Sequence, residues 1–243
     1  TWGAVAASAG LRRTAFRATS RALELAAAGF HPVRAGQGMY VSHYYGQHWV
    51  TPLRDIRPAM LEAHRLALAH GESDDAGYAL VTWLRIGWHL GTGLSQLEAE
   101  TQDVLRRLTR IGFRFYTPLV AGLAQAIAHL RQETPTPWRL TGHHLDEDRT
   151  LAELKAAGNS FAVSGLLLIK MQIARLFGAA GEARAIARDF APYARAQRGT
   201  YLEAIGRFEL GLIGTMGPFA GPAERRRAAR GLTRSLRWLR RSA

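Results

Sequence analysis

Residues that bind metal ions or transfer protons stand close together in segment 143–148, which contains His143, His144, Asp146 and Asp148. Histidine nitrogens and carboxylate oxygens are ligands of zinc, and a helical zinc site usually has two histidines four residues apart. That spacing is absent here, and the segment lies in a stretch of loop-forming residues. We therefore interpret these side chains as solvated loop residues and predict no metal site.

Carboxylates occur in close sets at Asp74 and Asp75, at Glu98 and Glu100, and at 146–148. Paired carboxylates carry general acid–base catalysis in many enzymes. Each set, however, lies at or near the predicted start of a helix, where the positive end of the helix dipole stabilises negative charge. Because this structural role accounts for all three sets, we predict no catalytic pair.

Phosphate-binding and nucleophile motifs give no better candidates. Neither Lys155 nor Lys170 stands in the glycine-rich setting of a Walker A loop. Residues 91–93 read Gly-Thr-Gly, but Gln96 occupies the third glycine position of a dinucleotide fingerprint, and no strand precedes it. No G-x-S-x-G elbow is present. We predict no catalytic and no cofactor-binding residue. A small all-α enzyme with an unrecognised site stays an alternative, and it would show a buried polar pocket with perturbed titrating groups.

The most distinctive surface feature is a basic stretch that we predict to form a helix over about 223–241. Residues 222–243 hold eight arginines against Glu224 alone, so +7 of the formal net charge of +13 lies there. The same helix carries a predicted apolar stripe of Ala229, Leu232, Leu236 and Leu239. The candidate interaction patch consists of Arg225, Arg226, Arg227, Arg230, Arg234, Arg237, Arg240 and Arg241.

A basic amphipathic helix can bind nucleic-acid phosphates, anionic lipid or an acidic protein. Only two of the 32 basic residues are lysine, a skew typical of a GC-rich genome, which weakens the arginines as a binding signal. We favour the interpretation that 223–241 is the last helix of a helical stack. Nucleic acid and a protein or lipid partner remain alternatives.

Composition indicates a globular protein rather than a disordered or membrane-spanning one. The chain has 243 residues, 47% hydrophobic and 21% charged, which is enough to bury a sizeable core. It has no cysteine, which excludes disulfides and thiolate sites and fits a reducing compartment. The most apolar run, 161–177, is interrupted by Lys170 and Arg175, so we predict no membrane span and a cytoplasmic location.

Apolar residues recur at intervals of three and four through nearly the whole chain, which predicts helices and no sheet. Glycines mark many of the predicted helix ends. Only 133–146 is clearly predicted to be a loop. The predicted helices cover 11–28, 33–48, 52–70, 73–90, 94–110, 113–132, 147–157, 160–178, 181–196, 199–215 and 223–241.

The predicted helices form pairs that recur at about 35–45 residues, a period typical of helical-hairpin repeats of the tetratricopeptide type. Segments 66–80 and 174–187 are two copies of the same glycine-containing turn. One hairpin cannot cover its own apolar face, so neighbouring hairpins must stack. Small turn residues such as Gly71, Gly178 and Gly181 are expected to let helices approach closely. We predict one all-α domain over 1–243, in which antiparallel hairpins stack as a tetratricopeptide-like right-handed solenoid.

The order of several segments resembles one helical-repeat region of large bacterial and fungal signalling proteins. H-W-x-x-P-L-R at 48–54 is followed by L-E-A-x-R-x-A-L-x-x-G-E at 61–72 and by D-A-G-Y-A-L at 75–80. Two later segments fall in the same order, L-T-G-H-H-L-D-E at 140–147 and A-R-L-F-G-A-A-G-E-A at 174–183. The matching residues of the first part are His48, Trp49, Pro52, Leu53, Arg54, Leu61, Glu62, Ala63, Arg65, Gly71, Ala76, Gly77, Tyr78 and Ala79.

In the proteins of that family, the region follows a predicted ATPase domain of the AAA/STAND type. A Ser/Thr-kinase-like domain often comes first, and a histidine kinase or nucleotide cyclase comes last. The resemblance implies that this chain is a fragment of such a protein and a non-catalytic scaffold that relays or senses a partner signal. ATP would bind in other domains of the parent, so the chain itself holds no cofactor. The expected partners are those other domains or a separate protein.

Overall fold

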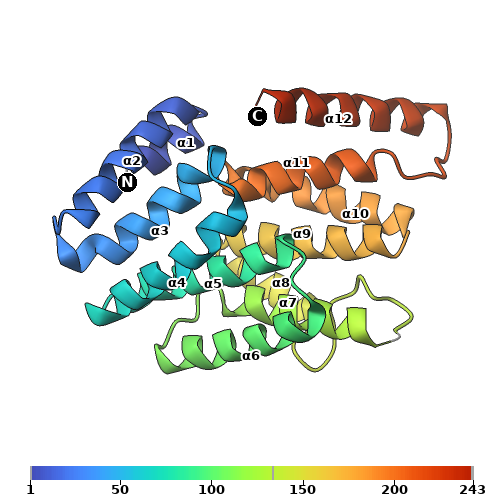
Figure 1. The fold of residues 1–243 in the computed structure, drawn as a ribbon. Helices are drawn as coiled ribbons and strands as arrows, with labels where there is room; N and C mark the ends of the chain where they lie inside the picture. Colours follow the sequence, from blue (N-terminus) through green and yellow to red (C-terminus); the bar gives the residue numbers. More distant parts are fainter. Residues whose placement is uncertain (1, 133, 242–243) are drawn as a thin grey trace.

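The computed structural model describes residues 2–132 and 134–241, and its secondary structure is entirely helical within those ranges (Figure 1). None of the described helices is long and apolar enough to cross a membrane. The elements are α1 Trp2–Ser8, α2 Arg12–Ala27, η1 Pro32–Arg34, α3 Ala35–Tyr45, η2 Gln47–Trp49, α4 Leu53–Ala69, α5 Ser73–His89, α6 Leu94–Arg110, α7 Thr117–Arg131, α8 Glu147–Ala156, α9 Ser160–Leu176, α10 Ala180–Phe190, η3 Ala191–Gln197, α11 Tyr201–Ile213 and α12 Pro222–Arg240, where η marks a 3₁₀ helix.

The all-α prediction is confirmed, and most predicted helices agree with the structure to within about two residues at each end. Proline explains two of the larger differences. Pro118 lies at the start of α7 and sets its first turn, so the helix begins at Thr117 rather than near 113. Pro192 ends the α-helical hydrogen bonding of α10 at Phe190, and the chain continues as the 3₁₀ helix η3. Helix α1 was not predicted.

The two turns that looked alike in the sequence have the same geometry. Gly71 and Gly178 adopt positive φ angles of 75° and 68°. In each turn the amide of the residue after the glycine donates back to a carbonyl of the helix, Glu72 N to Ala67 O and Ala179 N to Ala174 O, both at 2.9 Å. Glycine is favoured there because other residues are strained at positive φ.

The expectation that these turn glycines bring helices close together is wrong. A Cβ atom placed on Gly71, Gly178 or Gly181 would meet nothing within 4 Å. Close approach occurs instead at Gly36 in α3, where a Cβ would lie 2.6 Å from the backbone nitrogen of Ala67 in α4. Gly71 and Gly178 are therefore required by backbone conformation, and Gly36 by packing.

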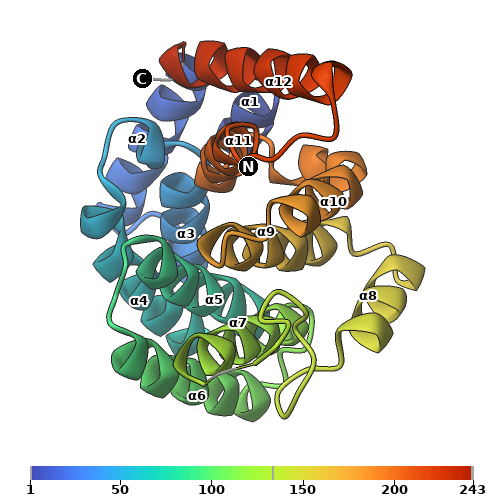
Figure 2. The same cartoon turned by 90° about the vertical axis from the view of Figure 1, so that its right-hand side faces the viewer.

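The helices alternate between an inner and an outer position. Figure 2 shows α1, α3, α5, α7, α9 and α11 toward the centre, with α2, α4, α6, α8, α10 and α12 around them. Most consecutive helices pack against each other, and several inner helices also contact the next inner helix. One continuous apolar core runs through these elements, from Tyr40 in α3 to Ile213 in α11.

The second helix and the last helix of the arrangement also meet. Arg12 of α2 donates from Nη1 to the backbone oxygen of Arg241, at 2.8 Å, just beyond α12. The guanidinium of Arg12 lies 4.3 Å from the ring centre of Trp49 and 4.9 Å from that of Trp238. These contacts make the described helices a compact body rather than an open array.

The predicted loop at 133–146 contains no helix over 134–146, and residue 133 lies outside the described residues. This loop is held against the body by buried groups. Leu140 is fully buried, and its amide donates to Glu147 Oε2 at 2.7 Å. Glu147 in turn pairs with Lys170 of α9 at 2.5 Å. The carbonyl of Pro137 contacts His129 Nδ1 at 2.9 Å.

Candidate functional site

The best-formed candidate site is a hollow of about 510 Å³, called the cleft, where the C-terminal ends of α5 and α9 meet the N-terminus of α6 and the middle of α11. Its lining combines apolar side chains, polar side chains and the glycines that follow α5. The lining residues are Trp88, His89, Gly91, Thr92, Gly93, Leu94, Leu97, Gln172, Arg175, Leu176, Ile205, Phe208 and Glu209.

A hydrogen-bonded polar network forms the floor of the cleft. Arg175 donates to both carboxylate oxygens of Glu209, from Nε at 2.6 Å and from Nη2 at 3.2 Å. Gln172 accepts from Trp88 Nε1 at 2.8 Å, and its amide nitrogen lies 3.5 Å from Glu209 Oε1. The bidentate pair fixes the orientation of both side chains. The floor therefore presents a rigid set of polar groups in fixed positions.

His89 stands at the inner end of this network. The amide nitrogen of Gln172 lies 3.5 Å from His89 Nδ1. Burial, with a smaller contribution from the nearby positive charge of Arg85, lowers the pKa of His89 to about 3. The imidazole is therefore neutral at neutral pH and has one N–H donor and one acceptor.

The rim of the cleft is apolar and open to solvent. Leu176 is 56% exposed and Phe208 is 49% exposed. Leu90, which immediately follows α5, is 42% exposed. Exposed apolar side chains around fixed polar groups are typical of a binding site, since the apolar groups supply area and the polar groups supply orientation.

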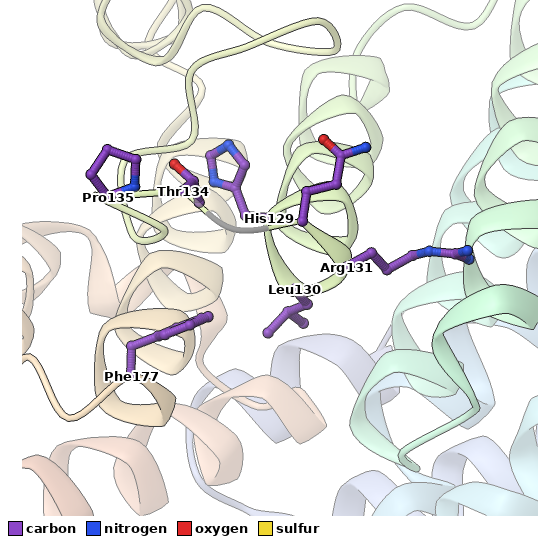
Figure 3. Close-up of a pocket in the computed structure, with 7 residues that line it drawn as sticks. His129, Leu130, Arg131, Thr134, Pro135 and Phe177 are labelled. Atoms are coloured by element: carbon purple, nitrogen blue, oxygen red, sulfur yellow. The ribbon is translucent and has the colours of Figure 1, made fainter.

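A second hollow, of about 680 Å³, adjoins the cleft across the end of α9. Figure 3 shows Phe177 and Leu130 on one side of it and Thr134 and Pro135 on another, while Arg131 points away. Two of its polar side chains already have partners within the chain. Arg131 pairs with Glu98 at 2.6 Å, and both ring nitrogens of His129 have partners within the chain. We therefore treat it as a less specific surface than the cleft.

The structure places all eight patch arginines on the exposed surface of α12 and the residue after it. Within the described part of the chain, no carboxylate forms an ion pair with any of the eight. A shallow groove of about 630 Å³ runs along one face of α12, lined by Arg230, Arg234, Arg237, Arg241, Trp238, Thr233 and Ala229.

The predicted apolar stripe of α12 is partly wrong. Ala229 and Leu236 face solvent, the latter 44% exposed, whereas Ser235 is buried. The cause is the small size of Gly211 on α11. A Cβ placed there would lie 3.5 Å from the Cβ of Ser235, so the two helices meet along their small residues. Leu232 and Leu239 are half-buried beside this contact.

The other sequence candidates have structural partners. Asp146 caps α8 by accepting from the Arg149 amide at 3.2 Å, as expected for a helix start. Asp148 pairs with Arg139 at 2.6 Å. His143 and His144 are exposed. In the described ranges, no group of three histidines or carboxylates is placed to hold a metal ion.

The structure also separates the two other carboxylate sets. Glu98 pairs with Arg131 of α7 and Glu100 with Arg57 of α4, so these carboxylates of α6 face different helices. Asp74 and Asp75 lie in the first turn of α5, as predicted. Asp75 is buried there and accepts from Gln37 Nε2 at 3.2 Å.

Sequence reasoning missed the residues that form the cleft floor. Gln172, Arg175 and Glu209 are polar residues within helices that are otherwise apolar in sequence, and that interruption was the available signal. Whether the polar residues of α9 face Glu209 of α11 depends on how the two helices cross. Helical periodicity in the sequence does not predict the crossing of two helices.

Comparison with protein-family models, curated proteins and solved structures finds no match. Function is therefore inferred from the geometry of the cleft and of α12.

Proposed function

We propose that this chain is a non-catalytic binding scaffold built from stacked helical hairpins of the tetratricopeptide type. The inner and outer alternation of helices and the shared geometry of the turns at Gly71 and Gly178 support the repeat interpretation. Such repeats bind partners because each hairpin adds side chains to a shared surface.

The cleft is the observation that carries this proposal. Its floor holds the bidentate Arg175–Glu209 pair, and its rim exposes Leu176 and Phe208. An extended segment of another domain or protein would place apolar side chains on the rim and backbone amides or carbonyls on the floor. The floor is already hydrogen-bonded internally, so it suits recognition more than chemistry.

The binding test compares rim variants with a matched surface control. Leu176→Glu and Phe208→Glu place a charge on the rim, and Leu236→Glu makes the same change at a 44% exposed position of α12. The probe is the purified flanking part of the same polypeptide, titrated calorimetrically. We expect at least tenfold weaker binding for the two rim variants and no change for the control. Equal binding by all three would reject the cleft as the binding surface.

The proposed context is a multidomain signalling ATPase or kinase, in which other domains bind ATP and this one relays a partner signal. The support is the colinear resemblance of segments 48–80, 140–147 and 174–183. The reading frame on both sides of the chain tests it. A Walker A motif upstream supports the relay role, and a gene without a P-loop, kinase or cyclase domain removes it.

A second candidate function is nucleic-acid binding by α12. The eight exposed arginines favour it, four of which line the 630 Å³ groove together with Trp238, since arginine contacts phosphates and an indole can stack on a base. The log of the binding constant should then fall with log salt by about 0.9 per phosphate contacted.

The test of this candidate uses two variants with equal loss of charge. In the first, Arg230, Arg234, Arg237 and Arg241 become Gln. In the second, the exposed arginines Arg13, Arg17, Arg110 and Arg114 become Gln. The groove variant should lose affinity for a labelled DNA or RNA oligonucleotide and show a shallower salt slope, whereas the control should lose little. Equal losses would mean non-specific attraction by net charge.

A further inference from the structure

Arg85 of α5 is a buried cation without a counter-charge. Its relative exposure is 5%. Within the described ranges, it has neither an ion pair nor a hydrogen bond, and its one ring contact is with Phe161 of α9, 5.7 Å from guanidinium carbon to ring centre. Gly165 of α9 packs closely against it, since a Cβ there would lie 3.4 Å from Arg85 Nη2 and 2.8 Å from a side-chain carbon of Leu119.

Other shielded cations of this protein are paired. Arg57 meets Glu100 at 2.5 Å, Lys170 meets Glu147 at 2.5 Å, and Arg175 meets Glu209 at 2.6 Å. Removing a charge from water is costly, and a carboxylate normally offsets that cost. Each of those three cations has a carboxylate partner, whereas Arg85 has none among the described residues.

The groups around Arg85 are neutral and come from every inner helix nearby. Tyr44 of α3, Tyr116 before α7 and Tyr201 of α11 lie within electrostatic range, as does His89 one turn further along α5. Burial raises the pKa of Tyr201 to about 12, so its hydroxyl stays protonated at neutral pH. None of these groups supplies the missing negative charge.

Tyr201 has an unsatisfied group of its own. Its buried hydroxyl has no hydrogen-bond partner. The ring centre of Tyr201 lies 5.8 Å from that of Tyr44 and 5.8 Å from that of His89, so the tyrosine closes the group around Arg85. The Tyr201 hydroxyl and the Arg85 guanidinium lie within electrostatic range of each other. Both are hydrogen-bond donors that lack an acceptor oxygen.

We propose that Arg85 and Tyr201 bind the anionic oxygen group of a small ligand, a carboxylate or a phosphate. The guanidinium fork matches two oxygens of either group, and the tyrosine hydroxyl donates to one of them. Neutral His89 can add a third donor. This assignment is independent of whether the cleft binds a partner.

Two hollows are lined by residues of this group, and Arg85 itself lines neither of them. His89 lines the cleft. Tyr201 lines a separate hollow of about 290 Å³ with His48, Trp49, Leu53, Ala204, Ile205 and Leu239. Trp49 Nε1 there is also buried without a partner. The apolar walls of this hollow suit a ligand that has an apolar body and one anionic end.

Anion binding is tested through the stability that it confers on the folded state. Urea unfolding of the full chain is measured at pH 7 in sodium phosphate, sodium acetate and sodium chloride of equal ionic strength. A folded-state ligand raises the unfolding midpoint with a saturable dependence on its concentration. We expect phosphate or acetate, but not chloride, to raise the midpoint of the wild type, and the anion with the larger effect identifies the preferred oxygen group.

Arg85→Met removes the charge at nearly constant volume, and Arg13→Gln on α2 removes an exposed arginine as the matched control. The midpoint shift should vanish in Arg85→Met and persist in Arg13→Gln. Tyr201→Phe should weaken the apparent affinity about tenfold, the effect of losing one hydrogen bond to a charged group. In chloride, Arg85→Met should unfold at a urea concentration no lower than the wild type.

Three results would overturn the assignment. One is a wild type whose midpoint responds to neither phosphate nor acetate beyond the chloride response. Another is an equal response in Arg85→Met and wild type, which would place the anions on the surface. If Arg85→Met does not fold, Arg85→Lys replaces it. Lysine keeps the charge but not the fork, so an unchanged affinity in Arg85→Lys would also count against the site.

Discussion

The Arg175–Glu209 pair allows a sharp test of how the cleft floor is held. Glu209 is 3% exposed at its side chain and Arg175 is 25% exposed. Breaking a buried ion pair costs about 3–5 kcal/mol, because one charge is left without a partner. In Glu209→Gln the remaining charge is Arg175, which reaches water, so we expect a smaller loss of about 2 kcal/mol. In Arg175→Gln the remaining charge is the inaccessible Glu209, so the full loss of about 3–5 kcal/mol is expected.

The assay is urea unfolding of the two single variants and the double variant, followed by Trp fluorescence. The double variant should lose less stability than the sum of the singles, with a coupling of about 2 kcal/mol, since no charge is left unpaired. The exposed pair of Arg139 and Asp148 is the control, and Asp148→Asn there should cost less than about 1 kcal/mol. Additive single losses, or a larger loss in Glu209→Gln than in Arg175→Gln, would refute this account of the floor.

Three further predictions concern stability and are checked by urea unfolding. Gly178→Ala should lower the free energy of unfolding by about 1 kcal/mol, because φ is 68° there. Gly181→Ala, within α10 and open to solvent, should raise it by about 0.5–1 kcal/mol. Gly36→Ala should cost about 1–3 kcal/mol, since its Cβ would lie 2.6 Å from the backbone of α4. Burial lowers the pKa of His48 and of His89 to about 3, below the unfolded value, so the folded state binds fewer protons and stability is lost as pH falls below about 6.5. Each histidine should contribute about 1 kcal/mol of loss between pH 6 and 5, and replacing either by Gln should flatten the profile.

Much of the helical architecture was predictable because it depends on local interactions. The turn glycines Gly71 and Gly178 fix where α4 and α9 end, and both could be read from the sequence. The bounds of α6 and α12 follow from apolar spacing in the same way. The short helix α1 was missed because its seven residues are too few to show a full apolar period.

The side of α12 that packs inward could not be predicted from the helix alone. Its leucines suggested one stripe, but the partner surface on α11 is shaped by Gly211, which admits Ser235 and leaves Leu236 outside. A similar limit applies to Arg85. In the sequence it is one of thirty arginines, and only the packing of inner helices shows that, among the described residues, no carboxylate reaches it.

The compact arrangement limits where a partner or ligand can enter. In an open solenoid, the inner helices line a groove that solvent fills. Here aromatic side chains fill the space between inner helices. Tyr44 of α3 contacts both Phe161 of α9 and Tyr201 of α11, with ring centres 6.4 Å and 5.8 Å apart.

Contacts between α2 and the residue after α12 bring an N-terminal helix and the last helix together at the same time. The accessible approach to the interior is therefore at the ends of the inner helices, where the cleft lies and where His89, one turn along α5 from Arg85, forms part of its lining. Because α5 carries both residues, a group bound in the cleft and an anion bound at Arg85 would act on the same helix. That connection offers a physical route by which the proposed scaffold would respond to two ligands.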